Sequence, residues 1–451
     1  MKQKSFFKET LWLLLIIFTF STRLFSQDIN ERIKLLEEKL KAQESLIQQQ
    51  QSTIKLLQEE LELIKKQSGQ EKIVAKVEEK PAYKSGGLFG ATSAYNPNIS
   101  LILDTFLYST NLKEDELESW NIPGFIKEGL EHKKGMNIHA AELYFFAPVD
   151  PFFNLYATIP VTEEGVELEE AYLVTTFLPA GIQAKIGKFK SGFGRHNSQH
   201  AHLWKFVDEP LVYRALTGHE GINEKGIQLT FLPDFPFYAQ LGIEALQGEN
   251  EILFGLDRSK GLHAFGAFAK ASFDIGDYGT ILLGPSVMIG DTKTESIEEN
   301  SIFTGDTTLA AFEFTYKWKP SRWKSFTLQS EYMWRKQKGK IQDTSTSTIN
   351  NLKRIQDGLY LQTIYQTGRW GFGARYDLLE PLNDKYNLDG VQTSFGDKPW
   401  RASAMVEFNP SEFSKIRLQY NYDKSSRTGK TNNEVYLQFI GGVGAHAAHS
   451  F

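Results

Sequence analysis

The chain has 451 residues, a formal net charge of −5, 41% hydrophobic and 13% aromatic residues, and no cysteine. The slightly acidic balance argues against a generally basic nucleic-acid-binding protein. The absence of cysteine excludes disulfides, thiolate metal ligands and cysteine nucleophiles.

The N-terminus has the pattern of an export signal. Three lysines within the first eight residues precede the apolar run LWLLLIIFTF, which is followed by STRLFSQ. This run is shorter than the roughly 20 apolar residues that a membrane-spanning helix needs, and Arg23 follows it closely. We therefore predict a signal peptide over residues 1–26. A membrane anchor is the alternative interpretation.

Residues 27–67 carry a heptad repeat. Its core positions are Ile33, Leu40, Ile47, Ile54 and Leu61, followed three residues later in each case by Leu36, Gln43, Gln50, Leu57 and Ile64. This spacing predicts a coiled coil, which implies self-association because a single helix buries nothing. We interpret it as a trimerisation stalk in the periplasm, although the mixed core also permits a dimer. Residues 68–97 mix Lys and Glu with Gly and Pro, which predicts a linker.

From residue 98 to residue 451 the hydrophobic period changes to two. In AFEFTYKW, for example, Phe312 and Phe314 alternate with Glu313 and Thr315. Such segments run for about ten residues, the length of a tilted strand that spans a bilayer, and many end in aromatic residues, as expected at a lipid interface. The predicted strands are 98–109, 136–147, 151–162, 166–178, 181–189, 226–233, 235–247, 263–274, 277–291, 305–318, 324–337, 354–366, 369–379, 398–409, 412–423 and 433–444.

The connections between these strands alternate between short and long. Short connections include 148–150, 179–180, 367–368 and 410–411. The long ones are 110–135, 190–225, 248–262, 292–304, 338–353 and 380–397. Tight turns at one end and long loops at the other are typical of bacterial outer-membrane barrels, whose short turns face the periplasm. The predicted fold class is therefore all-β: a transmembrane antiparallel β-barrel of about 16 strands, preceded by an N-terminal α-helical coiled coil.

A barrel of about 16 strands leaves an aqueous channel. The alternation directs charged side chains of both signs into this lumen. The lumen-lining candidates are Lys317, Glu331, Arg335, Arg375, Arg401, Lys415 and Arg417, accompanied by Glu313, Asp377, Glu407 and Asp423. Rings of charged residues select ions in such pores, but any water-filled barrel requires a polar lining. The mixed signs therefore leave anion or cation preference open.

One segment, residues 185–233, carries a family resemblance. Its sequence is KIGKFKSGFGRHNSQHAHLWKFVDEPLVYRALTGHEGINEKGIQLTFLP. The Gly-Lys-Phe strand end, the Asp-x-Pro-Leu-Val stretch and the Gly before the next strand resemble outer-membrane porin-type proteins related to the phosphate-selective porins. The resemblance implies a trimer, basic residues along an anion path, and a third outer loop that folds inward to narrow the pore. That loop is 190–225 here, where acidic residues intersperse the basic ones instead of leaving a dense basic lining.

The stretch GRHNSQHAHLWKF, within this loop, contains three histidines. His200 and His202 would point the same way on a strand, and with His196 they could bind zinc, copper or nickel. The stretch supplies no acidic fourth ligand before Asp208, so neither a metal site nor a cofactor is expected. The candidates for a pore constriction are Lys190, Arg195, His196, His200 and His202. If the histidines titrate near neutrality, selectivity shifts toward anions as the pH falls from about 8 to about 5.5.

These features predict an outer-membrane porin that forms a water-filled channel for passive diffusion of small hydrophilic or ionic solutes. The expected partners are outer-membrane lipid, the barrel-assembly machinery and two further copies of the chain, and no nucleic acid. A TonB-dependent-like receptor for a metal or nutrient would need about 22 strands around a plug. We expect no enzyme, since Ser191 and Ser198 near His196 lack a nucleophile-elbow signature. A structural barrel without transport is the remaining alternative.

Overall fold

The computed structural model describes residues 97–127, 129–130, 132–255, 261–298 and 300–444. All of them belong to the second of two compact units, Lys84–Phe451. The predicted signal peptide and coiled coil, and the linker up to residue 96, lie outside the described residues. Within the described residues, no helix is long and apolar enough to cross a bilayer.

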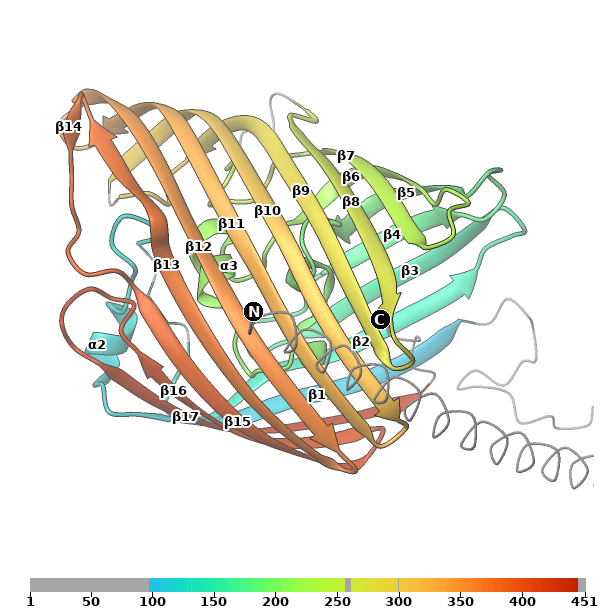
Figure 1. Ribbon diagram of the computed structural model, residues 1–451. Helices are drawn as coiled ribbons and strands as arrows, with labels where there is room; N and C mark the ends of the chain where they lie inside the picture. The colour runs from blue at the N-terminus through green and yellow to red at the C-terminus, as the bar shows by residue number, and fades with distance from the viewer. Residues whose placement is uncertain (1–96, 128, 131, 256–260, 299, 445–451) are drawn as a thin grey trace, which may run out of the picture. The chain divides into compact units, whose positions relative to one another are not determined.

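Sixteen antiparallel strands form a closed barrel (Figure 1). Each strand pairs with its neighbours in chain order, and β17 pairs with β1, which leaves the sheet without a free edge. A short strand, β14, adds two residues at the end of β13. The strands are β1 (Asn98–Thr110), β2 (Gly135–Pro148), β3 (Phe153–Val161), β4 (Glu170–Thr175), β5 (Ile182–Lys190), β6 (Asn223–Phe231), β7 (Tyr238–Leu246), β8 (Ala264–Ile275), β9 (Gly279–Thr294), β10 (Ser301–Ser321), β11 (Lys324–Asp343), β12 (Ile349–Thr367), β13 (Trp370–Leu388), β14 (Val391–Gln392), β15 (Trp400–Ser411), β16 (Ser414–Asp423) and β17 (Asn432–Gly444).

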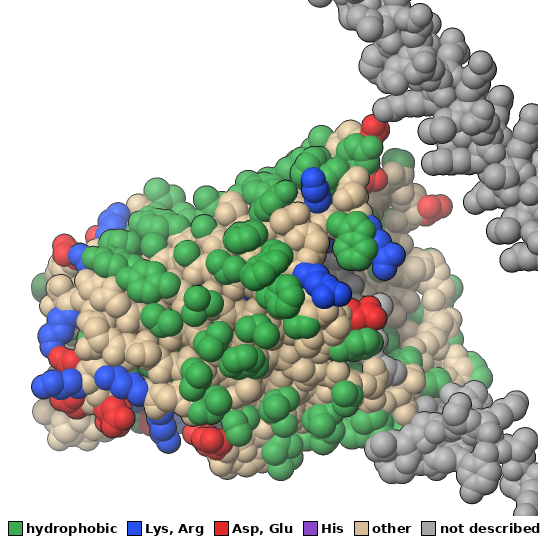
Figure 2. All heavy atoms as spheres, turned by 90° about the horizontal axis from the view of Figure 1, so that it is seen from below, with side chains coloured by type: hydrophobic (Ala, Val, Ile, Leu, Met, Phe, Trp, Pro, Cys, Tyr) green, Lys and Arg blue, Asp and Glu red, His purple; other side chains and the backbone are tan. Residues whose placement is uncertain are grey.

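The outer wall of the barrel is apolar. Along β10, the outward-facing Phe312 and Trp318 are exposed, whereas Glu313 and Thr315 between them are buried. Figure 2 shows hydrophobic side chains over the middle of one face of the barrel and charged side chains gathered toward its ends. A closed sheet with an apolar band outside satisfies every backbone hydrogen bond internally, which is the condition for crossing lipid.

The sixteen predicted strands are confirmed, but three of the predicted long loops are wrong. Residues 292–304, 338–353 and 380–397 belong mostly to β9–β14, because β10–β13 run for 19 to 21 residues. Hydrogen-bonded pairing continues to the end of β10 and β11, where Ser301 lies opposite Asp343. In this part of β11, Lys336 and Lys338 face outward and are exposed. The apolar alternation therefore stops where the strands leave the apolar band, although the sheet itself continues.

Three long connections at one end of the barrel concern the site. We call them loop 1 (residues 111–134), loop 3 (191–222) and loop 4 (247–263), by their order among the connections at that end. Loop 1 contains helix α2 (Glu114–Glu118). Loop 3 contains two short 3-10 turns, His196–Ser198 and Ala201–Leu203, and helix α3 (Leu211–Thr217). The opposite end of the barrel carries the short turns, such as residues 276–278 between β8 and β9.

Candidate functional site

Loop 3 lies inside the barrel rather than over its rim. Figure 1 shows α3 within the ring of strands, and α3 packs against β11, β12 and β13. Pro210 immediately precedes this helix and Gly218, with φ of 81°, ends it, as expected from the preferences of proline and glycine at helix ends. Every residue of α3 is buried. The interior of the barrel is therefore occupied in part by this loop.

Glu331 on β11 anchors the first part of loop 3. Its carboxylate accepts hydrogen bonds from the backbone N–H groups of Arg195 and His196, both at 2.9 Å. It also accepts hydrogen bonds from the hydroxyl groups of Tyr213 and Tyr360, both at 2.6 Å. The Glu331 side chain is fully buried. These four hydrogen bonds compensate the buried carboxylate for its loss of contact with water.

Gly194 permits this close approach of the loop to the wall. Its φ of 63° lies in the left-handed region that favours glycine. A Cβ atom at this position would lie 2.3 Å from the Tyr213 hydroxyl oxygen and 2.5 Å from a Glu331 carboxylate oxygen. The Gly194 carbonyl also accepts a hydrogen bond from Lys270 Nζ on β8, at 2.7 Å. A side chain here would displace the loop from its anchor.

A buried ion-pair network holds the second part of loop 3 against β13 and β15. The carboxylate of Asp208 contacts Arg375 and Arg401, each at 2.7 Å. Asp377 contacts Arg375 at 3.0 Å and accepts the backbone N–H of Leu211, the first residue of α3, at 2.9 Å. Burial would raise the pKa of Asp208, but the two arginines hold it below its usual value. Asp208 therefore keeps its negative charge inside the barrel.

Two further arginines of the wall bind carbonyl groups of loop 3. Arg417 on β16 donates to the carbonyl of Trp204 at 2.9 Å and pairs with Glu407 at 2.7 Å. Arg335 on β11 donates to the carbonyls of Ala215 and Leu216, near the C-terminal end of α3. Cations at this end of a helix are favoured by the exposed carbonyls and the helix dipole.

The predicted lumen-lining residues thus divide into two groups. Glu331, Arg335, Arg375, Arg401 and Arg417 point inward, and loop 3 covers them. Lys317 and Lys415 are only half-buried, and Lys415 lies 3.9 Å from Glu407. Loop 3 therefore occupies the space that an open lumen would leave beside the first group.

Apolar side chains fill the lumen between loops 1, 3 and 4 and the wall. We call this the apolar lumen cluster; it includes Ile122, Phe125 and Ile126 of loop 1, Phe193, Leu211, Val212 and Leu216 of loop 3, Ile252, Leu253 and Phe254 of loop 4, and Met288, Leu309, Met333, Tyr360 and Leu379 of β9–β13. Such a cluster was not predicted, because its members are spread over three loops that are distant in sequence and meet only in the closed barrel. It fixes loop 3 against one side of the barrel.

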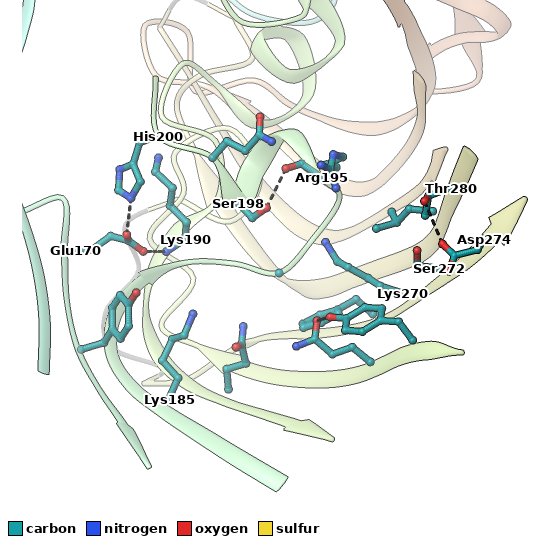
Figure 3. A pocket seen from close by; sticks show the side chains of 18 residues that line it. Glu170, Lys185, Lys190, Arg195, Ser198, His200, Lys270, Ser272, Asp274 and Thr280 are labelled. Carbon is teal, nitrogen blue, oxygen red and sulfur yellow. Dashed lines mark hydrogen bonds and ion pairs between the residues drawn. The ribbon is translucent and has the colours of Figure 1, made fainter. Parts of the chain in front are cut away.

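The other side of the lumen contains a cavity of about 740 Å³ (Figure 3). It extends from loop 3 to the short-turn ends of β8 and β9, where Asp274 and Thr280 lie. We call it the basic cavity, since four lysine and arginine residues line it against two acidic ones. Its charged lining residues are Lys185, Lys190, Arg195, Lys270, Glu170 and Asp274, with His200 at its edge. Three predicted constriction residues, Lys190, Arg195 and His200, therefore line one cavity.

The three histidines of loop 3 do not converge. His196 is buried against Trp204 and Tyr213, with ring centroids 4.6 and 4.9 Å away. His200 and His202 lie next to each other, with ring centroids 5.8 Å apart. The predicted alternative of a metal ion bound by all three is therefore wrong.

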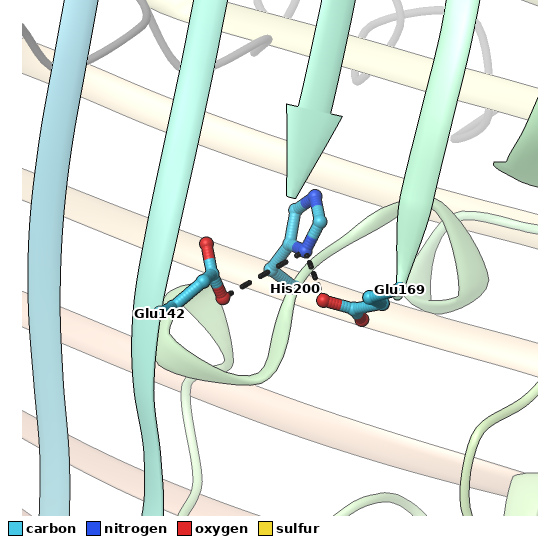
Figure 4. A group of neighbouring side chains, drawn as sticks. All are labelled: Glu142, Glu169 and His200. Carbon is cyan, nitrogen blue, oxygen red and sulfur yellow. Dashed lines mark hydrogen bonds and ion pairs between the residues drawn. The ribbon is translucent and has the colours of Figure 1, made fainter. Parts of the chain in front are cut away.

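His200 and His202 instead meet glutamates that are distant in sequence, and Figure 4 shows His200 between Glu142 and Glu169. His200 Nδ1 lies 3.1 Å from Glu169 Oε2 and 3.9 Å from Glu142 Oε2. His200 Nε2 lies 2.9 Å from Glu170 Oε2, and His202 Nδ1 lies 3.2 Å from Glu142 Oε2. Lys190 Nζ completes the group at 2.9 Å from Glu169 Oε1.

These surroundings separate the pKa values of two of the histidines. Burial lowers the pKa of His196 to about 3, and the nearby Arg375 contributes to the lowering. Burial would also lower the pKa of His200, but hydrogen bonds to Glu169 and Glu170 raise it to about 10. Neither residue changes charge between pH 8 and pH 5.5. The pH-dependent selectivity predicted from the sequence therefore cannot arise from His196 or His200.

Sequence reasoning did not identify Glu142, Glu169 or Lys185 as site residues. Glu142 is the single acidic residue within strand β2, which contains no Lys or Arg, and this isolation was an available signal. Lys185 Nζ lies 4.7 Å from the centroid of the Tyr172 ring at the wall of the basic cavity. The serines considered for catalysis bond elsewhere: Ser191 donates to Glu244 at 2.5 Å, and Ser198 donates to the carbonyl of Arg195.

Comparison with known proteins gives one sequence relative and several similar folds. No protein-family model matches the chain. An uncharacterized protein of Aquifex aeolicus is 39% identical over 406 residues, which cover 84% of this chain and 85% of the relative.

Among solved structures, the anion-selective porin from Comamonas acidovorans has a TM-score of 0.50 at 10% identity, covering 77% of this chain and 99% of that chain. The outer-membrane channel DcaP of Acinetobacter baumannii has a TM-score of 0.49 at 12% identity, covering 78% of this chain and 99% of that chain. At these identities the likeness concerns the barrel fold alone.

Proposed function

Because this chain belongs to one family with the uncharacterized Aquifex aeolicus protein and folds as a closed sixteen-stranded barrel, we propose that it is an outer-membrane porin. It forms a channel through which small hydrophilic solutes diffuse passively. The apolar outer wall and the wide barrel support this function, since barrels of about 16 strands accommodate an aqueous path.

The observation that carries the proposal is the placement of loop 3. This loop is bonded to wall residues such as Glu331, Arg375 and Arg417, and the basic cavity lies on its remaining side. Loop 3 then narrows the channel to a path that passes Lys190, Arg195 and His200. Loop 3 would thereby set the size of the solutes that pass.

The charges of the basic cavity favour anions among these solutes. Lys190 is paired with Glu169, and Lys270 with Glu313. Lys185 lies over the rings of Tyr172 and Phe189, and Arg195 reaches the cavity from loop 3. A channel wall with a local excess of positive charge raises the concentration of anions beside it. We therefore expect a moderate preference for chloride over potassium.

Single-channel recording in planar bilayers tests the function directly. The full chain should produce open steps of uniform size, and its reversal potential in a KCl gradient should indicate anion preference. Lys185→Gln combined with Arg195→Gln should move the reversal potential toward that of an unselective channel. Lys338→Gln is the matched control, because Lys338 lies exposed on β11 outside the cavity lining.

A barrel without transport is the second candidate. The apolar lumen cluster favours it, since apolar side chains of three loops occupy much of the lumen beside β9–β13. Membranes that stay silent after verified insertion of the barrel would establish this candidate and refute the porin. If Lys338→Gln shifts the reversal potential as much as the double variant does, the basic cavity does not set the selectivity, although the protein is still a porin.

The assembly follows from the heptad repeat. We propose that residues 27–67 form a periplasmic coiled coil joining three chains, with residues 1–26 removed as a signal peptide. The barrel would sit in outer-membrane lipid with its short turns toward the periplasm, as is usual for barrels with short turns at one end and long loops at the other.

A further inference from the structure

The group around His200 has the composition of a metal site. Within the described residues, donor atoms of Glu142, Glu169 and His200 all lie within 4.8 Å of one another. They come from β2, from the residue before β4, and from loop 3, so tertiary packing alone brings them together. Imidazole with carboxylates suits zinc and related divalent transition metals.

The spacing of the donor atoms fits one ion. The donors of a tetrahedral zinc site lie about 2.1 Å from the ion and therefore roughly 3.4 Å from one another. Here His200 Nδ1 lies 3.1 Å from Glu169 Oε2 and 3.9 Å from Glu142 Oε2. These two separations lie on either side of the tetrahedral value. His202 Nδ1 lies 3.2 Å from Glu142 Oε2, beside this group of three donors.

Neighbouring groups hold these donors in the orientation that a metal requires. Glu170 Oε2 lies 2.9 Å from His200 Nε2, which leaves Nδ1 for the ion, and Glu170 Oε1 accepts the backbone N–H of Lys190 at 2.7 Å. A carboxylate bonded to the second nitrogen is the usual partner of a metal-binding histidine. Glu169 divides its oxygens similarly, with Oε1 on Lys190 and Oε2 beside His200.

The charge balance also favours a cation. Three carboxylates, those of Glu142, Glu169 and Glu170, surround the imidazole of His200, and the positive charges of Lys190 and protonated His200 offset only two of them. The group is reachable, because Glu170, Lys190 and His200 line the basic cavity. Ions that enter the cavity therefore reach His200, one of the three donors.

We propose that Glu142, Glu169 and His200 bind one divalent transition-metal ion, represented by Zn²⁺, with a water molecule in the fourth position. Binding releases the proton of His200 Nδ1 to solvent, so affinity falls as the pH falls. The ion links loop 3 to β2 and to the start of β4, which restricts movement of the loop. The proposal does not depend on transport.

Titration calorimetry with ZnCl₂ on the full chain in detergent tests the site. We expect one Zn²⁺ per chain, bound at least tenfold more weakly by Glu169→Gln and by His200→Gln. Glu167→Gln is the matched control: Glu167 is an exposed glutamate two residues from Glu169, and its side chain lies 4.0 Å from Lys188. Its affinity should match that of the unmodified chain within about twofold, since Glu167 lies outside the ligand set.

Co²⁺ absorption supplies an independent measurement. Tetrahedral Co²⁺ gives an intense visible band, which we expect in the unmodified chain and in Glu167→Gln but not in Glu142→Gln. The heat-modifiable migration of folded barrels confirms that each variant is folded. Absence of saturable binding by the unmodified chain, or an equal loss in Glu167→Gln, overturns the proposal. A silent channel that still binds Zn²⁺ refutes the porin and leaves the site intact.

Discussion

Buried charged residues of the barrel wall bind loop 3. Glu331 accepts four hydrogen bonds, two of them from the backbone of loop 3, and Arg375 and Arg401 share Asp208. Removing one partner of such a buried pair costs about 3–5 kcal/mol, because the other charge remains buried. The main effect of substituting these wall residues should therefore be a displacement of loop 3, and a change in the charge of the channel lining should be secondary.

Glu331→Gln should loosen loop 3. The amide group presents N–H where the backbone N–H groups of Arg195 and His196 need an acceptor, and each bond to a charged group contributes about 1.5–3 kcal/mol. We expect faster proteolysis within residues 191–222 and more frequent conductance fluctuations. Glu412→Gln, at an exposed short turn, is the control. Equal protection of loop 3 in both variants would show that Glu331 is not its anchor.

His196 should make the folded state sensitive to acid. Its pKa is about 3 in the fold and about 6.5 in an unfolded chain. Between these values only the unfolded chain binds the proton, so falling pH removes about 1.4 kcal/mol of stability per unit. Between pH 7.5 and pH 5, the unmodified chain should lose about 2 kcal/mol more than His196→Gln in denaturant unfolding. Parallel losses would contradict the neutral, buried state of His196.

At the scale of elements, the strands are longer than the bilayer requires. A strand tilted by about 40° rises roughly 2.5 Å in height per residue, and the apolar band of such barrels is about 25 Å tall. β12 runs from Ile349 to Thr367, so its upper part extends beyond the band. The same geometry applies to β10, β11 and β13, which explains why their upper parts carry polar residues on the outer face.

Because outward-facing residues of one strand lie at different depths in the apolar band, a charged substitution should destabilise the barrel by different amounts at different positions. Leu361 and Ile349 are both exposed on the outer face of β12, but Leu361 lies about 15 Å above the short turn and Ile349 about 45 Å above it. Leu361→Arg should destabilise the barrel by about 2–4 kcal/mol, and Ile349→Arg by at most about 1 kcal/mol. Unfolding in lipid vesicles measures both values. Similar costs for the two variants would place the band elsewhere.

At the scale of the whole molecule, closure of the sheet does not depend on association between chains. Pairing of β17 with β1 removes the free edges, so the barrel is complete as a single chain. Three loops then fill part of its interior with the apolar lumen cluster. Association of chains is therefore not needed to close the barrel, and the heptad repeat of residues 27–67 is the feature that predicts it.

Disrupting the heptad core should dissociate the assembly. Ile47→Asp puts a charge at a core position, whereas Gln49→Asp puts the same charge two residues away, outside the core. Native mass spectrometry in detergent should find trimers for the unmodified chain and Gln49→Asp, and monomers for Ile47→Asp. Trimers in all three samples would assign the assembly to contacts of the barrel.

The sequence by itself determined the barrel, because lipid outside and water inside impose a period of two on every spanning strand. That period located all sixteen strands, and the order of the strands identified residues 190–225 as the third outer loop. The alternation of apolar and polar residues stops where β10–β13 extend beyond the lipid, so the sequence did not predict the upper parts of these strands.

Only the tertiary structure decided what the inward residues bind. Glu331 holds Arg195 and His196, and Glu169 meets His200, because closing the barrel brings strands that are distant in sequence around one loop. Local alternation shows that a side chain points inward. It contains no information about which partner arrives from the other side of the lumen, since that depends on how loop 3 packs across it.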